Sequence, residues 1–318
     1  MNHQPTPAEP AATAAVATPE AVASPELGGG KRSGGRRAAL APVALVVAGA
    51  LSVQFGAAIA VLLMPRAGAL GVVTLRLAAA ALVLLAVCRP RLRGHSRADW
   101  GTVVAFGIAM GGMNTLFYQA ADRIPLGAAV TLEVLGPLAL SVIASRRLVN
   151  VVWAALALGG VVLLSGGGFD RLDPVGAAYA LGAGAMWAAY IVFSARTGRR
   201  FPQADGLALA MVVAALLSLP LGIMDAGSKL LVPTTLGLGA AVALLSSVLP
   251  YTLELIALRR LPAPTFAILM SLEPAVAAMA GFLVLDQALS TTDALAIALV
   301  IGASMGAVRS QVRGVPKR

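Results

Sequence analysis

Ten long apolar runs, each close to the length of a bilayer crossing, constrain this chain more than any other feature. They cover residues 38–63, 68–88, 100–120, 126–145, 149–166, 174–194, 203–223, 234–258, 264–285 and 292–309. About 20 apolar residues in a helix cross the hydrocarbon core, and an open strand there would leave its backbone groups unpaired. Because the runs are too long for barrel strands and only 12% of residues are charged, a soluble domain is excluded. We expect an all-α integral membrane protein with ten transmembrane helices.

The basic residues predict the orientation of these helices, because Lys and Arg are retained on the cytoplasmic side of a membrane. With the N-terminus inside, nineteen of the 24 Lys and Arg residues fall in inner segments. Four fall in outer loops: Arg66, Arg123, Arg171 and Lys229. Both termini are therefore predicted to be cytoplasmic. The net charge of +10 then indicates topology, and no nucleic-acid partner is expected.

The ends of the chain differ in composition from the apolar runs. Residues 1–37 are rich in Pro, Ala, Thr, Ser and Gly without apolar periodicity, which predicts a disordered cytoplasmic tail. The run at 38–63 is longer than a signal-peptide core, so we interpret it as an uncleaved first helix. Residues 310–318 form a short basic tail.

The two five-helix halves, residues 38–166 and 174–309, resemble each other at an offset of 137 residues. Over residues 115–137, 8 of 23 positions are identical to their counterparts, among them Pro137 and Pro274. An odd number of helices per half makes the two halves enter the membrane from opposite sides. Inverted repeats of this kind place a substrate path at their interface near the bilayer midplane, with alternating access by rocking of the halves. A transporter of a small molecule within membrane lipid is the class that this pattern favours.

Four charged residues lie more than three positions from either end of the predicted spans: Arg76, Glu133, Glu254 and Glu273. Each would cost roughly 3 kcal/mol if it faced lipid near the bilayer centre, so all should face the bundle interior. Arg76 could bind the carboxylate of an amino acid by a two-pronged hydrogen bond. The alternative is that Arg76 pairs with a buried Glu. For Glu254, a salt bridge at the interface with Arg259 and Arg260 is the simpler interpretation.

Glu133 and Glu273 lie on equivalent helices of the two halves, about one turn apart when the halves are aligned. Burial favours the protonated form of a carboxylate, so each could exchange a proton for a cationic amino group. That exchange is the chemistry of a proton antiporter. A hydrogen bond between helices, or a pair with Arg76, is the alternative for both.

Proline and polar residues inside the spans are further candidates. Proline removes a backbone donor and frees the carbonyl one turn earlier, so these prolines are either hinges or packing kinks: Pro137, Pro250 and Pro274. Six polar or amphipathic residues at membrane depth are candidates for lining a binding pocket: Gln54, Asn114, Tyr118, Trp187, Tyr190 and Tyr251. The alternative for Trp187 and Tyr190 is the headgroup belt, where Trp and Tyr are enriched.

Two GxxxG patterns, Gly107/Gly111 and Gly302/Gly306, allow close approach of helices. Internal packing is the default, and the second pattern makes a homodimer possible. No glycine run is followed by the Lys-Ser or Lys-Thr of a phosphate-binding loop. One cysteine and two histidines outside the spans make a metal site very unfavourable. We therefore expect no cofactor and no ATP-driven transport.

Two long strings of sequence, at residues 111–147 (GGMNTLFYQAADRIPLGAAVTLEVLGPLALSVIASRR) and 249–278 (LPYTLELIALRRLPAPTFAILMSLEPAVAA), are distinctive, as are the shorter ones at 74–80 and 180–192. Together they resemble the threonine/homoserine exporter branch of the EamA family, in the drug/metabolite transporter superfamily. The resemblance covers residues from about 40 to 309. It implies a ten-helix secondary carrier of the bacterial inner membrane that exports small amino acids, with protons as the counter-substrate.

Three other functions were weighed against this one. A broader metabolite or drug effluxer belongs to the same superfamily, and the sequence does not separate it from an amino-acid exporter. A membrane-embedded enzyme would need clustered acids or histidines, which the spans lack. A passive channel would need charged groups repeated by symmetry, but Glu133 aligns with Met270 and Glu273 with Gly136. We therefore do not expect an enzyme.

Overall fold

The computed structural model describes residues 34–145, 148–164, 173–201, 204–250, 253, 257 and 269–312, and every regular element in them is a helix. The elements are α1 (Gly34–Cys88), α2 (Arg97–Ala121), α3 (Leu126–Glu133), α4 (Leu135–Ser145), α5 (Leu148–Leu164), α6 (Pro174–Gly198), α7 (Asp205–Ala226), η1 (Gly227–Leu231), α8 (Pro233–Ala243), η2 (Leu244–Val248), α11 (Glu273–Leu285) and α12 (Thr291–Val312). Within this part of the chain, five helices are long and apolar enough to cross a membrane, and four further apolar helices are shorter. The protein is thus an all-helical membrane protein.

α1 covers two of the expected spans, and the loop expected at residues 64–67 is helical instead. The helix is interrupted at Gly68, which has φ 67° and ψ 164°. Glycine adopts a positive φ without steric cost, and a side chain at Gly68 would overlap the carboxylate of Asp225 in α7. That carboxylate accepts a hydrogen bond from the backbone N–H of Leu70 (3.0 Å). Asp225 therefore satisfies one of the open N–H groups where the helix resumes.

The span expected at residues 126–145 is also divided, because α3 ends at Glu133 and α4 begins at Leu135. Pro137 cannot donate to the carbonyl of Glu133, the bond that would carry a continuous helix across this point. A corresponding turn at Ser271 and Leu272 precedes α11. Both turns lie directly before a helix whose first turn contains a proline, Pro137 or Pro274.

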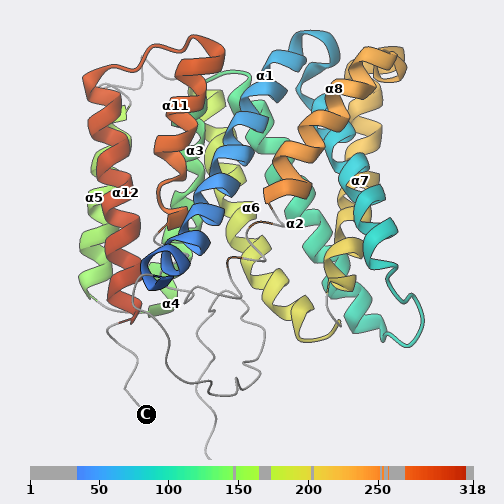
Figure 1. Cartoon of the computed structure of the whole chain (residues 1–318), viewed down its shortest axis with the longest axis horizontal. Helices are drawn as coiled ribbons and strands as arrows, with labels where there is room; N and C mark the ends of the chain where they lie inside the picture. The colour runs from blue at the N-terminus through green and yellow to red at the C-terminus, as the bar shows by residue number, and fades with distance from the viewer. Residues whose placement is uncertain are drawn as a thin grey trace, which may run out of the picture.

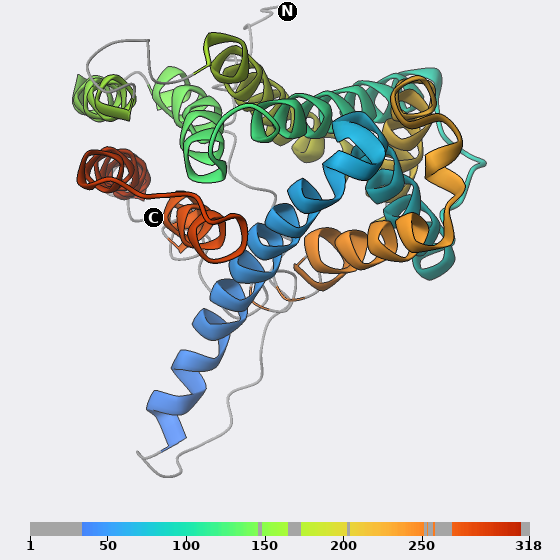
Figure 2. The same cartoon turned by 90° about the horizontal axis from the view of Figure 1, so that it is seen from above.

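Three pairs of helices form the most extensive contacts between distant parts of the described sequence. α1 packs on α7, α2 on α6, and α5 on α12 (Figures 1 and 2). Gly107 and Gly111 of α2 face α7, where a side chain on Gly111 would be 3.3 Å from the Cα of Ala214. The internal-packing interpretation of the first GxxxG pattern is therefore confirmed. In the second pattern, Gly306 packs on Trp153, whereas a side chain on Gly302 would have no atom of the described residues within 4 Å of its Cβ.

Ion pairs join the ends of the helices. Arg123, after α2, lies 3.2 Å from the carboxylate of Asp173, the N-cap residue of α6. The backbone N–H of Val175 donates to the same carboxylate (3.1 Å), and this bond, with Arg123, lowers the pKa of Asp173. At the opposite ends of α2 and α6, Arg200 pairs with Asp99 at 3.1 Å. The two pairs hold α6 against α2 at both ends.

Candidate functional site

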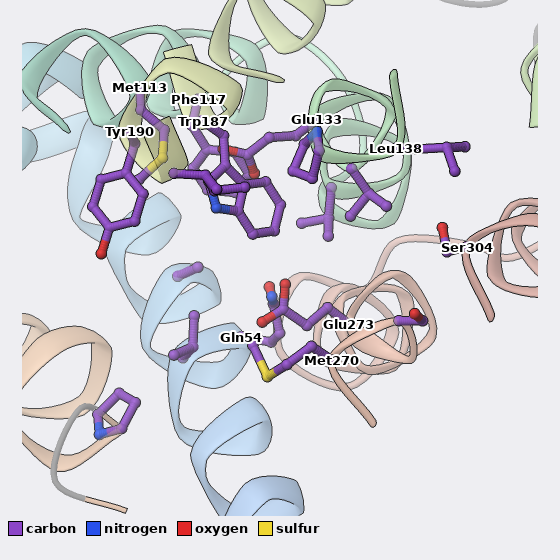
Figure 3. Close-up of a pocket in the computed structure, with 18 of the residues that line it drawn as sticks. Gln54, Met113, Phe117, Glu133, Leu138, Trp187, Tyr190, Met270, Glu273 and Ser304 are labelled. Carbon is purple, nitrogen blue, oxygen red and sulfur yellow. The ribbon is translucent and has the colours of Figure 1, made fainter. Parts of the chain in front are cut away.

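A cavity of about 410 Å³ lies between the helices and collects most of the residues expected to form a site (Figure 3). Its lining includes seven of the expected binding or coupling residues: Gln54, Arg76, Asn114, Glu133, Trp187, Tyr190 and Glu273. Two of the three hinge candidates, Pro137 and Pro250, also line it. Tyr118 and Pro274 are buried but do not line the cavity. Tyr251 and Glu254 lie outside the described residues.

Arg76, in the second half of α1, is held by uncharged partners. Its Nη1 donates to the hydroxyl of Tyr118 (3.1 Å), its Nη2 to the carbonyl of Ser246 (3.0 Å), and its Nε to the hydroxyl of Ser247 (3.4 Å). The guanidinium also lies 5.5 Å from the centre of the Tyr118 ring. A guanidinium has five N–H donors, so two remain without a partner among the described residues. The expected alternative, an ion pair between Arg76 and Glu133, is not formed within this part of the structure.

A π-helical turn supplies the backbone acceptor for Arg76. In an α-helix the N–H groups of residues 249 and 250 would bond the carbonyls of residues 245 and 246. Here the N–H of Leu249 bonds the carbonyl of Leu244 instead, and Pro250 has no N–H. The freed carbonyl of Leu245 accepts from Ser52 (2.6 Å), and that of Ser246 accepts from Arg76. π-turns occur frequently at functional sites.

Glu133 is the last residue of α3 and is 9% exposed. It lines the cavity, and among the described residues no hydrogen bond to its side chain is formed. Its backbone carbonyl, freed by Pro137, lies against Gly184 of α6, where a side chain would be 2.5 Å from the carbonyl oxygen. Gly136 fits equally closely against the backbone of Gly184. These two glycines let the break between α3 and α4 touch α6, which sets the position of Glu133.

Glu273 is the first residue of α11 and is 7% exposed. The positive end of a helix dipole stabilises negative charge at this position. Figure 3 shows the side chains of Glu273 and Gln54 extending into the same part of the cavity. Gln54 comes from the first half of α1, so the cavity joins residues that are more than 200 positions apart in sequence.

The remaining wall is apolar and aromatic, with Met113, Phe117, Trp187, Tyr190 and Met270 among its residues. Tyr190 packs on Phe106, with ring centres 5.1 Å apart. The amide of Asn114 donates to the carbonyl of Met110 in its own helix (2.9 Å), so part of its hydrogen-bonding capacity is used locally.

Five serines near the site were not expected from the sequence. Ser246 and Ser247 contact Arg76, Ser52 contacts the π-turn, and Ser271 and Ser304 line the cavity. The signal for the first two was a Ser-Ser pair just before Pro250 inside an apolar run. Ser304 had no such signal, because serine is common in membrane helices where it bonds its own backbone.

Chemically, the cavity offers one fixed cation, two carboxylates and several neutral oxygens inside apolar walls. A guanidinium with free N–H groups suits a carboxylate, and carboxylates suit an ammonium group or a proton. Apolar helices around a buried, charged cavity define the protein as a membrane transport protein of the α-helical class.

Comparison with known proteins gives the family. The chain belongs to the EamA-like transporter family, whose model matches residues 174–309. It is 43% identical over 267 residues to the threonine/homoserine exporter RhtA of Escherichia coli K12, covering 83% of this chain and 90% of the relative. The protein of that name in Salmonella typhimurium LT2 is 42% identical over the same share.

A more distant relative and one solved structure are also similar. The uncharacterized transporter YwfM of Bacillus subtilis is 29% identical over 69% of this chain and 77% of its own length. One crystal structure of another protein matches with a TM-score of 0.55 at 21% identity, over 85% of this chain and 98% of that one. This last match concerns the fold alone.

Proposed function

We propose that this chain is a secondary active transporter that exports small neutral amino acids similar to threonine and homoserine. The observation that carries the proposal is the buried cavity in which two N–H groups of Arg76 have no partner among the described residues and Glu133 and Glu273 supply carboxylates. A zwitterionic amino acid has the complementary charges. The printed name of the relatives at 42–43% identity, threonine/homoserine exporter, supports the choice of substrate.

In this proposal, Arg76 binds the substrate carboxylate through its unused N–H groups. Tyr118 and the carbonyl of Ser246 fix the guanidinium from the other side, so the charge is oriented before substrate arrives. Glu133 and Glu273 bind either the ammonium group or a proton. Because one site then holds substrate and proton in turn, their competition couples export to proton entry.

The proposed topology has ten membrane spans in two inverted halves, residues 38–166 and 174–309, with both termini in the cytoplasm of a bacterial cell and the chain in its inner membrane. An offset of 137 relates residues 68–88 of α1 to residues 205–225, nearly the whole of α7. Elements that lie next to a two-fold axis meet their counterparts on it, and α1 does pack on α7, as α5 packs on α12. The family model's match to residues 174–309 supports the division between the halves.

A second candidate, export of a wider range of metabolites or drugs, is favoured by the cavity wall. Met and aromatic side chains adapt to many ligand shapes, and Met113, Phe117, Trp187 and Met270 are part of that wall. The volume of about 410 Å³ lies within the range of pockets for drug-sized ligands. Both candidates use the same rocking mechanism and differ only in the molecules that compete for the cavity.

Counterflow in proteoliposomes tests the proposal. Vesicles loaded with unlabelled threonine should accumulate radiolabelled threonine and homoserine, and an imposed pH gradient should stimulate the exchange. Competition by a panel of larger amino acids and hydrophobic cations separates the two candidates. Folded protein that exchanges neither threonine nor homoserine would refute amino-acid export.

A further inference from the structure

Three neutral oxygens in the cavity wall have no hydrogen-bond partner in the described part of the chain. They are Gln54 Oε1, Ser246 Oγ and Ser304 Oγ, each in a residue that is 3–7% exposed. Only one other buried side-chain oxygen among the described residues shares this property, in Thr197, which does not line the cavity. Buried polar atoms are nearly always hydrogen-bonded, so a cluster of exceptions in one cavity requires an explanation.

A ligand with a neutral hydrogen-bond donor explains the cluster. The charged groups of the cavity already match the two charges of an amino acid, and apolar side chains would suffice for an alkyl chain. A neutral oxygen that still lacks a donor can accept from an uncharged group without burial of a further charge, and a hydroxyl on the substrate side chain is such a donor. We infer that the cavity contains a subsite for the side-chain hydroxyl of the amino acid, with Gln54 as its principal acceptor.

Gln54 has the best position of the three oxygens. Its side chain extends from α1 toward Glu273 (Figure 3), beside the carboxylate that would hold the ammonium group. Ser246 already supplies its carbonyl to Arg76, and Ser304 lies near Leu138 in the wall formed by α4 and α12. The hydroxyl of threonine is only two bonds from the carbon that carries the ammonium group. Gln54 therefore lies on the side of the site where that hydroxyl would project.

The inference rests on the proposed function and gives it a selectivity. Sites that hydrogen-bond a substrate hydroxyl reject analogues that lack it, because the buried acceptor then stays unpaired. Threonine should therefore be preferred over valine, which replaces the hydroxyl with a methyl group, and over 2-aminobutyrate, which lacks it. Homoserine minus its hydroxyl is also 2-aminobutyrate, so one analogue serves both substrates.

The experiment measures the inhibition of threonine counterflow by 2-aminobutyrate and valine in wild-type protein and in Gln54→Met. Methionine keeps the length of the side chain and removes its acceptor. We expect the preference for threonine to fall about tenfold, the equivalent of one buried hydrogen bond, through a higher KM for threonine alone. Gln119→Met, on a half-buried glutamine of α2 that does not line the cavity, is the matched control and should keep the wild-type preference.

A second variant and a comparison of substrates in wild-type protein complete the test. If Gln54→Met does not insert, Gln54→Asn retracts the amide by one carbon and should lower the same preference, read as ligand-induced thermal stabilisation in detergent. An unchanged preference in either variant would overturn the inference. Wild-type protein that exchanges threonine and 2-aminobutyrate equally would overturn it too, while leaving the proposed export intact, whereas no exchange of any amino acid would remove the proposed function itself.

Discussion

The contact between α6 and the break after α3 leads to a sharp prediction for Gly184→Ala. The new Cβ would lie 2.5 Å from the carbonyl oxygen of Glu133 and 3.2 Å from the backbone nitrogen of Gly136. Both are backbone atoms, so α6 or the α3–α4 break must move by about 0.9 Å to bring the shorter distance to ordinary contact at 3.4 Å. Overpacking of this kind costs about 1–3 kcal/mol, and the better helix propensity of alanine returns up to about 1 kcal/mol.

Gly302→Ala is the control for that substitution. Gly302 lies in α12, and no atom of the described part of the chain would be within 4 Å of the added Cβ, so only the gain in helix propensity applies there. Melting in detergent should show Gly184→Ala less stable than Gly302→Ala by about 2 kcal/mol. Threonine exchange should fall in Gly184→Ala alone, because Glu133 moves with the break. Wild-type melting and wild-type exchange in Gly184→Ala would refute this description of the contact.

Three further predictions concern the site and the helix ends. Pro250→Ala restores an N–H that competes with Arg76 for the carbonyl of Ser246, so the KM for threonine should rise about tenfold. The control, Pro220→Ala, changes an exposed proline inside α7 and should leave the KM unchanged. Equal KM values in the two variants would count against the role assigned to Pro250 at the π-turn. Glu133→Gln or Glu273→Gln should abolish the pH dependence of exchange while threonine binding is retained. Unaltered pH profiles in both variants would remove support for proton coupling. The lowered pKa of Asp173 means that its charge stabilises the fold above about pH 4, its unfolded value, and that this contribution is lost as pH falls through the lower folded value. The difference in melting temperature between wild type and Asp173→Ala should therefore be largest at pH 7 and shrink as pH falls below about 4. A difference that is constant with pH would contradict the assignment.

The membrane class of the fold followed from apolar run lengths, because lipid allows few alternatives to a helix. The interruptions inside the runs were harder to place. Gly68 breaks α1 because Asp225, 157 residues later, caps the resumed helix, and no local pattern reveals such a partner. The break at Val134 was predictable only in part from the sequence. Pro137 marks the lost hydrogen bond but does not show whether the helix bends or stops there.

The site residues that could be predicted from the sequence were those of types that are rare inside membrane spans. Arg76, Glu133 and Glu273 stood out because a charge inside a span is costly, and the structure brings all three to one cavity. The partners of Arg76 did not stand out. The carbonyl of Ser246 is available because Pro250 lacks the N–H that would bond it in an α-helix, and the neighbouring π-turn, which frees the carbonyl of Leu245, has no simple sequence signature. Common residues such as Ser304 acquire a role only from three-dimensional placement.

The central claim is that the cavity around Arg76 is the place where substrate binds. Its most direct test is binding of radiolabelled threonine to purified protein in detergent, in wild type, in Arg76→Ala and in Arg66→Ala, whose arginine is exposed at the far end of the first span. We predict saturable binding in wild type and Arg66→Ala, and its loss in a folded, monodisperse Arg76→Ala. Wild-type affinity in Arg76→Ala would contradict the account.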